Sequence, residues 1–299
     1  MFKKVIRYAS NPYYALGYDL IKTNPHLMSD KFFLSVLWKM LMGYELDWKH
    51  PQTLNEKLQW LKLYDRNPLY TKLVDKYLVK QWVAEKIGEQ YIIPTLAVYR
   101  SVDEIDLDKL PDQFVLKCNH DSGSVVICRD KGTFDIESAK EKLSVALKRN
   151  FYWEAREWPY KNVDRLVFAE KYIQEGPEGN LTDYKFFCFN GIPDCVMVCI
   201  DRHINQPKFY FFNQSWDLQR YNIRGREAPS DFSLPKPPII DELFRLASIL
   251  SDNIPFVRAD FYGVSESAYF GELTFFPEGG FDRNILPTAD YFWGQKILL

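Results

Sequence analysis

The chain has 299 residues, 46% of them hydrophobic and 26% charged, which is enough to build one large domain or two to three subdomains around a core. The net charge of −2 argues against a broadly basic surface for nucleic acid. The five cysteines, an odd number in apolar segments, fit a reducing compartment, and their spacing does not predict a zinc site. They are Cys118, Cys128, Cys188, Cys195 and Cys199.

The first twenty residues contain no apolar run long enough for a signal peptide or a membrane span. Phe2, Val5, Ile6 and Ala9 recur at helical spacing, with basic residues on other faces. An interfacial membrane helix and a helix docked on the body of the protein both fit this pattern, and its short length favours docking. We therefore expect a cytoplasmic protein without a membrane span, for which peripheral membrane association stays open. The sequence does not fix the oligomeric state.

Helical periodicity dominates residues 1–90 and is strongest in 30–46 and 53–66. Thr53 is followed three residues later by Glu56 and then by an apolar run, which predicts a capping box at a helix start. A further helix is predicted over 69–86, with Gly88 suited to its C-terminal cap.

From residue 91 onward the pattern changes to short segments rich in β-branched and aromatic residues. Two helices are predicted among them, over 136–149 and 239–249. The fold class is therefore α+β, with mainly antiparallel sheet in the second half. The predicted strands lie at 91–99, 113–118, 127–134, 165–173, 183–191, 194–201, 208–213, 255–264 and 268–276.

The last strand pair carries unusual charges. Alternation places Arg258 and Asp260 on one face of the first strand, and Glu272 and Thr274 share a face of the second. The connection is short enough for the strands to pair, so Asp260 and Glu272 can meet. Buried carboxylates are costly unless they are paired or bound to metal. Two interpretations remain open. The residues could form an oxygen-ligand Mg²⁺ site, with Arg258 countering phosphate charge, or a structural Arg–Asp pair.

Three other elements interrupt apolar strands with charge. Lys117 ends a strand and precedes a turn with serine and glycine, an arrangement that can surround phosphates but is common at strand ends. Glu170 and Lys171 fall within another apolar run, and Lys185 within a third. Taken singly, a structural lysine is the favoured explanation for each.

The order of these elements resembles the TupA-like ATP-grasp family of bacterial surface-polysaccharide gene clusters, whose members are often labelled glycosyltransferases. The strings that carry the resemblance are DKYLV, FVLKCNHDSGS, REWPYKN, DYKFFCFNG and FVRADFY with YFGELTFFPEGGF. The resemblance spans residues 25–299. It implies an ATP-grasp fold with a mainly helical region at 1–90, a small lid subdomain at 91–173 and a large subdomain with the metal site at 174–299.

The resemblance also implies site residues, with ATP and two Mg²⁺ ions as cofactors. Those implied to bind the nucleotide are Lys76, Lys117, His120, Ser122, Gly123, Ser124, Glu170, Lys171, Tyr172, Ile173, Asp183 and Lys185. Within this set, Lys76 and Lys117 hold phosphates, the loop at 120–124 covers them, and 170–173 is the hinge that binds adenine. Arg258 and Lys185 are the implied catalytic residues. The implied metal ligands are Asp260, Glu272 and Thr274.

The sequence departs from the family pattern at three places. Asp121 adds a negative charge to a loop that usually reads N-H-G-S-G, Pro159 replaces a histidine, and residues 277–280 read P-E-G-G rather than P-G-S-G. We expect the loop at 120–124 to have few packing contacts and to be mobile without nucleotide. We also expect Asp121 to point to solvent, because a carboxylate beside the phosphates would repel them, so that Asp121→Gly is neutral or raises ATP affinity modestly.

The implied activity is that of an ATP-dependent carboxylate–amine ligase, which forms an amide through an acylphosphate. Family context suggests a uronic-acid-type sugar carboxylate and an amino acid or other amine as substrates in capsule or cell-surface polysaccharide synthesis. A glycosyltransferase is the first alternative, although no doubly wound βαβ series is predicted. A non-catalytic nucleotide- or glycan-binding module and a kinase-like enzyme that stops at phosphorylation are the others.

Overall fold

The computed structural model describes residues 25–173, 181–200, 207–264 and 267–299. The helix expected at residues 2–9 lies outside them. Within these ranges, the α-helices before residue 90 are α3 (Asp30–Met42), α4 (Leu54–Tyr64), α5 (Leu69–Val74) and α6 (Val79–Ile87). Later helices are α7 (Ile136–Lys148), α8 (Tyr152–Ala155), α9 (Ile223–Glu227), α10 (Ile240–Leu250) and α11 (Pro287–Gly294). No helix within these ranges is both long and apolar enough to cross a membrane.

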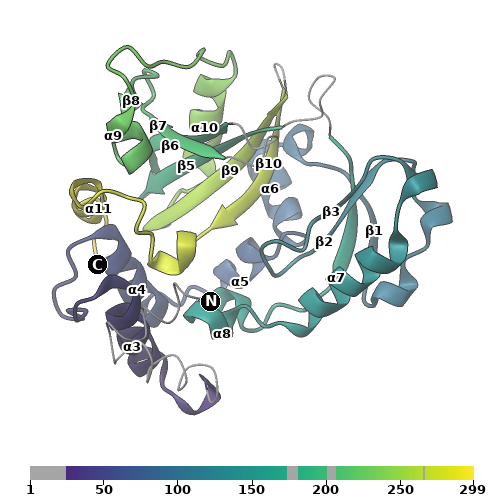
Figure 1. Ribbon diagram of the computed structural model, residues 1–299, viewed down its shortest axis with the longest axis horizontal. Helices are drawn as coiled ribbons and strands as arrows, with labels where there is room; N and C mark the ends of the chain where they lie inside the picture. Colours follow the sequence, from purple (N-terminus) through teal and green to yellow (C-terminus); the bar gives the residue numbers. More distant parts are fainter. Residues whose placement is uncertain (1–24, 174–180, 201–206, 265–266) are drawn as a thin grey trace, which may run out of the picture.

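Two antiparallel sheets form the body of the protein (Figure 1). The first sheet, in the order β1-β4-β2-β3, consists of β1 (Thr95–Tyr99), β2 (Phe114–Cys118), β3 (Val126–Cys128) and β4 (Val167–Lys171). The second, in the order β10-β9-β5-β6-β7-β8, consists of β5 (Thr182–Phe189), β6 (Ile192–Ile200), β7 (Lys208–Phe212), β8 (Leu218–Gln219), β9 (Phe256–Val264) and β10 (Ser267–Thr274). The predicted α+β class is confirmed.

Each sheet has one face covered by a helix, and part of its other face contributes to the cavity described below. Helix α7 packs on the first sheet at β2, and α10 packs on β5, β6 and β9 of the second (Figure 1). In the second sheet, Phe186 of β5 meets Phe244 of α10 edge to face, with ring centroids 4.9 Å apart. Because side chains alternate along a strand, the neighbours Asp183 and Lys185 face the other way.

The helical region confirms one predicted boundary and corrects another. Thr53 and Glu56 form the predicted capping box at the start of α4. The single helix predicted over 69–86 is wrong, because α5 ends at Val74 and α6 begins at Val79. Between them, the Asp75 carboxylate accepts the backbone N–H groups of residues 77 and 78, which competes with continuation of the helix.

The helical region shares its core with the second sheet. Buried apolar side chains of α4, α5 and α6 pack in one cluster with those of β5, β6, β9 and α10. All five cysteines are free and buried in the structure, as expected from their position in apolar segments, where cysteine packs as a small apolar side chain.

Candidate active site

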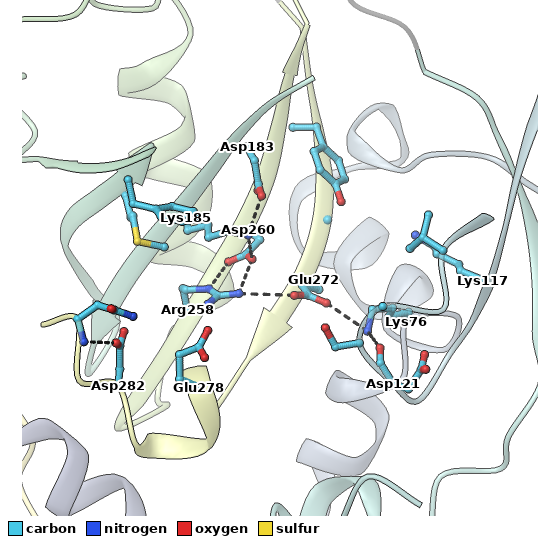
Figure 2. Close-up of a pocket in the computed structure, with 18 of the residues that line it drawn as sticks. Lys76, Lys117, Asp121, Asp183, Lys185, Arg258, Asp260, Glu272, Glu278 and Asp282 are labelled. Carbon is cyan, nitrogen blue, oxygen red and sulfur yellow. Dashed lines mark hydrogen bonds and ion pairs between the residues drawn. The ribbon is translucent and has the colours of Figure 1, made fainter. Parts of the chain in front are cut away.

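A cavity of about 430 Å³ is lined by residues of both sheets and of the segments that join them (Figure 2). Figure 2 shows Lys117 and Lys76 toward one end, Arg258 and Glu272 in the middle, and acidic side chains toward the other end. The cavity therefore brings together Lys117, Lys185 and the charged residues of the last strand pair, whereas Glu170 and Lys171, which the sequence also singled out, do not line it.

The two carboxylates of the last strand pair do meet. Asp260 of β9 and Glu272 of β10 are directly opposite each other in the antiparallel ladder. A bulge between Phe270 and Glu272 makes this possible, since Phe270 packs on the buried Phe261 while Glu272 faces the cavity. A Cβ on Gly271 would lie 3.0 Å from the carbonyl oxygen of Asp260, so glycine allows this close approach of the backbones.

Asp260 is held by two cations. Arg258 donates from Nε to Oδ1 and from Nη2 to Oδ2, each at 2.7 Å, and Lys185 Nζ lies 2.7 Å from Oδ2. The same lysine lies 2.8 Å from a carboxylate oxygen of Asp183. Burial raises the pKa of Asp260, and the two neighbouring cations act in the opposite direction. The result is a compact network in which both catalytic candidates, Arg258 and Lys185, share one carboxylate.

Glu272 connects this network to Lys76. Its Oε2 lies 3.2 Å from Lys76 Nζ, and its Oε1 lies 3.5 Å from Arg258 Nη2. Burial alone would raise the pKa of Glu272, but Lys76, Arg258 and Lys185 lower it to about 2. Since 33% of its side chain is exposed, Glu272 is an ionised carboxylate that remains accessible from the cavity.

Thr274 lies at the edge of the same network. Its hydroxyl accepts from Arg258 Nη2 at 3.2 Å and donates to Glu272 Oε1 at 3.4 Å. The hydroxyl therefore contacts both an implied catalytic residue and an implied metal ligand, and its role as a metal ligand stays a prediction.

At the other end of the cavity, Lys117 is paired with a buried carboxylate. Glu170 of β4 is only 3% exposed, and its two oxygens lie 2.5 Å from the ammonium groups of Lys117 and of Lys80 on α6. Burial alone would raise the pKa of Glu170, but the two lysines lower it below its ordinary value. The Glu170 carboxylate thus lies behind Lys117, in contact with two lysines.

The phosphate loop, residues 120–124, differs from the expectation. Asp121 is 4% exposed, and its Oδ1 accepts a hydrogen bond of 2.6 Å from the Ser124 hydroxyl. Ser124 Oγ also accepts from the backbone N–H of Cys118, and Lys76 Nζ donates to the carbonyl oxygen of Asp121. The prediction of a solvent-facing Asp121 is therefore wrong, whereas Ser122 and Gly123 are exposed, and mobility of the loop without nucleotide stays a prediction. The loop has internal partners that compensate for burying the carboxylate.

Several implied nucleotide residues lie away from the cavity. The His120 ring is buried beside α7, with Nε2 3.2 Å from the carbonyl oxygen of Ala146. Lys171 and Tyr172 line a separate open hollow with residues of β1 and of the loop before β2. Contacts of His120, Lys171, Tyr172 and Ile173 with a nucleotide remain predictions.

Other lining residues carried no signal in the sequence. Met197, Phe209 and Phe211 place apolar side chains beside Lys185, because β6 and β7 continue the same face of the sheet. Asn222 and Asn284 arrive through a bridge between residues 222 and 285 that only the tertiary fold forms. Alternation could have identified the apolar set once the strand order was known.

The loop at Pro277–Gly280 is held from α4. Gln59 donates to the carbonyl oxygens of Gly279 and Gly280, at 3.3 and 2.6 Å. Lys62, which is fully buried, donates to the carbonyl oxygens of Gly279 and Ala155. Burial lowers the pKa of Lys62 below its ordinary value. These contacts place the Glu278 side chain at the cavity, in a left-handed backbone conformation with φ of 51°.

The carboxylates in the middle of the cavity have the chemistry of an Mg²⁺ site. Within the described ranges, no three side chains of His, Cys, Asp or Glu gather as a complete metal-binding group. Asp260 and Glu272 nevertheless present adjacent oxygen ligands, which Mg²⁺ prefers, and Mg²⁺ commonly completes its shell with water and substrate phosphates. The residues therefore fit Mg²⁺ bound together with a phosphate ligand.

Comparison with solved structures found 138 similar chains, among them two D-alanine–D-alanine ligases and an ATP-grasp ligase. The D-alanine–D-alanine ligase of Helicobacter pylori is 15% identical, with a TM-score of 0.43 over 82% of this chain and 69% of that one. The Bacillus anthracis enzyme complexed with ATP is 14% identical, with a TM-score of 0.43 over 92% and 75%. The ATP-grasp ligase PsnB, complexed with a minimal precursor, Mg and ADP, is 9% identical, with a TM-score of 0.38 over 87% and 66%.

A comparison with curated proteins found no match. The model of the TupA-like ATPgrasp family, in contrast, matches residues 56–298. This range contains Lys76, Lys117, Lys185, Arg258 and the carboxylate pair that line the cavity. The chain belongs to the TupA-like ATP-grasp family.

Proposed function

We propose that the protein is an ATP-dependent carboxylate–amine ligase that forms an amide through an acylphosphate. The observation that carries the proposal is that one cavity holds both four cations and two adjacent carboxylates, Asp260 and Glu272 (Figure 2). The cations are Lys76, Lys117, Lys185 and Arg258. A cavity with these charges suits a polyphosphate bound together with a divalent cation. The cationic side chains attract the phosphates, and the divalent cation neutralises the carboxylates that would otherwise repel them.

In this proposal, the triphosphate of ATP lies between the two sheets. Lys117 and Lys76 contact its phosphates from the side of the first sheet, and the phosphate loop covers them. The hinge at residues 170–173, where β4 ends, binds the adenine edge. The three regions implied by the family, at 1–90, 91–173 and 174–299, are proposed as the parts that surround the nucleotide.

Asp260 and Glu272 would hold two Mg²⁺ ions with the phosphates, with Thr274 as a further oxygen ligand. The ions would neutralise charge on the transferring phosphoryl group. Arg258 and Lys185 are already fixed by hydrogen bonds to Asp260, so they present oriented positive charge without reorganisation during the reaction.

The reaction then has two steps. An oxygen of the substrate carboxylate attacks the γ-phosphorus of ATP, which releases ADP and gives an acylphosphate. The amine nitrogen next attacks the acyl carbon and loses a proton, and phosphate leaves as the amide forms. Residues of the phosphate loop exclude water that would hydrolyse the acylphosphate.

The proposed substrates are a uronic-acid-type sugar carboxylate, on a glycan or its precursor, and an amino acid or other amine. Family context supports this choice, and the half-buried Phe209 offers apolar surface at the cavity on which a sugar ring can pack. The setting would be capsule or cell-surface polysaccharide synthesis in the bacterial cytoplasm.

The experiment is a screen of ADP release from the purified protein, with uronic acids crossed against amino acids. Release that requires both partners supports the ligase, and Asp260→Asn serves as the inactive control. Release with the carboxylate alone would instead identify a kinase-like enzyme.

Calorimetry with ATP·Mg²⁺ and with UDP-sugars separates the remaining alternatives. Tight UDP-sugar binding without ATP binding would favour a glycosyltransferase. ATP binding without turnover for any substrate pair would favour a non-catalytic binding module.

A further inference from the structure

Lys80 of α6 has a lysine's full set of hydrogen bonds but lies outside the cavity lining. Its Nζ donates to the carbonyl oxygen of Ile93 and to the hydroxyl of Thr95, each at 2.8 Å, and lies 2.5 Å from Glu170 Oε1. An ammonium group has three N–H donors, so this geometry uses all of them. Lys80 is therefore fixed in place by α6, β1 and β4 together.

Glu170 transmits that fixed position to the cavity. Its second oxygen lies 2.5 Å from Lys117 Nζ, and Lys117 lines the cavity whereas Glu170 is buried behind it. Both ammonium groups also lie over the same ring, Phe168, at 5.2 and 5.3 Å from its centroid. The three charged groups thus form one row, in which the carboxylate lies between the two lysines.

The net charge of these three side chains determines the electrostatic potential at the Lys117 end of the cavity. Lys117 and Glu170 alone would be a neutral pair, with a carboxylate placed close to where phosphates bind. Lys80 adds one positive charge at the far side of that carboxylate, so the row as a whole is cationic. Opposite charges a few ångströms apart in a partly buried site interact strongly.

We propose that Lys80 is a positioning residue for nucleotide binding: it neutralises and anchors Glu170, so that Lys117 is aimed into the cavity with its positive charge available to phosphate. This inference rests on the proposed nucleotide site. It assigns Lys80 an indirect role, because it acts only through Glu170 and does not contact the nucleotide.

The test measures ATP·Mg²⁺ dissociation constants by calorimetry for four proteins: the parent, Lys80→Met, Glu170→Gln and the double variant. Lys80→Met should weaken binding about 10- to 100-fold, as expected for removing one charge in a site of intermediate dielectric. In the Glu170→Gln background the same substitution should change the constant less than about 3-fold, because no carboxylate remains to be neutralised.

Lys86→Met is the matched control, since Lys86 is exposed on the same helix and should leave binding unchanged. Lys80→Gln tests the charge separately from the fold, because it removes the charge and retains a donor for Ile93 or Thr95. Thermal melting shows whether each variant is folded.

The outcomes are distinguishable. A parent protein that does not bind ATP·Mg²⁺ contradicts the proposed function itself. If the parent binds and Lys80→Met costs the same factor with and without Glu170, then Lys80 acts independently of Glu170 and the inference is wrong. Unchanged binding in folded Lys80→Met or Lys80→Gln would also overturn it.

Discussion

The two sheets present opposite electrostatic characters to the same cavity. On the first sheet, Glu170 is shared by two lysines, which leaves one net positive charge. On the second, Lys185 and Arg258 face three acids, which leaves one net negative charge when all are ionised. These acids are Asp183, Asp260 and Glu272. The first side is thus prepared for an anion, whereas the second needs a further cation before an anion can approach it.

Lys76 connects the two sides. It extends from the break between α5 and α6, with its ammonium 3.2 Å from Glu272 and 2.6 Å from the carbonyl oxygen of Asp121. A metal ion bound to the Glu272 carboxylate would weaken the ion pair between Glu272 and Lys76. We therefore expect variants of the second sheet to change the Mg²⁺ dependence of activity. Variants on the side of the first sheet should change the dependence on ATP instead.

The largest effect is expected from Asp260→Asn. The substitution removes the charge that two cations and the proposed metal share, so turnover should fall by about 10³-fold. ADP release at increasing Mg²⁺ measures this loss, and the Mg²⁺ requirement should rise as well. Asp241→Asn, on the exposed surface of α10, is the control. Near-normal ADP release by Asp260→Asn would show that the metal does not bind there.

A smaller loss, about 10²-fold in kcat/KM for ATP, is expected from Lys117→Met. Because Lys117 belongs to the anion side, the Mg²⁺ concentration for half-maximal activity should stay unchanged. Steady-state kinetics at varied ATP and Mg²⁺ separate the two quantities. A Lys117→Met variant with an altered Mg²⁺ requirement would remove the distinction between the sheets.

Some of this arrangement was accessible from the sequence. Strand alternation placed Arg258 with Asp260, and the order of motifs brought the lysines into one site. Lys80 was not identified, although it lies four residues after Lys76, because its role depends on Glu170, which is distant in sequence. The sequence does not predict the burial of Asp121 either. Ser124, which donates to its carboxylate, is only three residues away, but the contact of Lys76 with the Asp121 carbonyl oxygen joins distant parts of the chain.

The structure reverses the expected effect of changing Asp121. Asp121→Ala should now raise the KM for ATP about 3- to 10-fold, because it removes the hydrogen bond that closes the phosphate loop. Ser124→Ala breaks the same bond and also removes the acceptor of the Cys118 N–H, so it should give at least as large an increase. The double variant should be little worse than Ser124→Ala alone, because the bond between the two side chains is already lost there. Fully additive losses in the kinetics would mean that the two residues act separately.

The smallest effect concerns stability toward acid. The folded-state pKa of Glu272, about 2, lies below the ordinary value of 4.5, so its ionisation stabilises the folded protein above pH 4.5. This contribution is lost as the pH falls from 4.5 toward 2. Glu272→Gln should therefore have a flatter dependence of denaturation midpoint on pH in this window. Parallel curves for the two proteins would contradict the ionic environment described for Glu272.

The grip of α4 on residues 277–280 has a consequence for engineering new specificities. Gln59 and Lys62 recognise the carbonyl groups of this segment across more than two hundred positions of the chain. Exchanging residues 277–280 for those of a relative would change the side chain at position 278. The new backbone would then have to fit Gln59 and Lys62 of an unchanged α4. Active chimeras should therefore exchange α4 and residues 277–280 together.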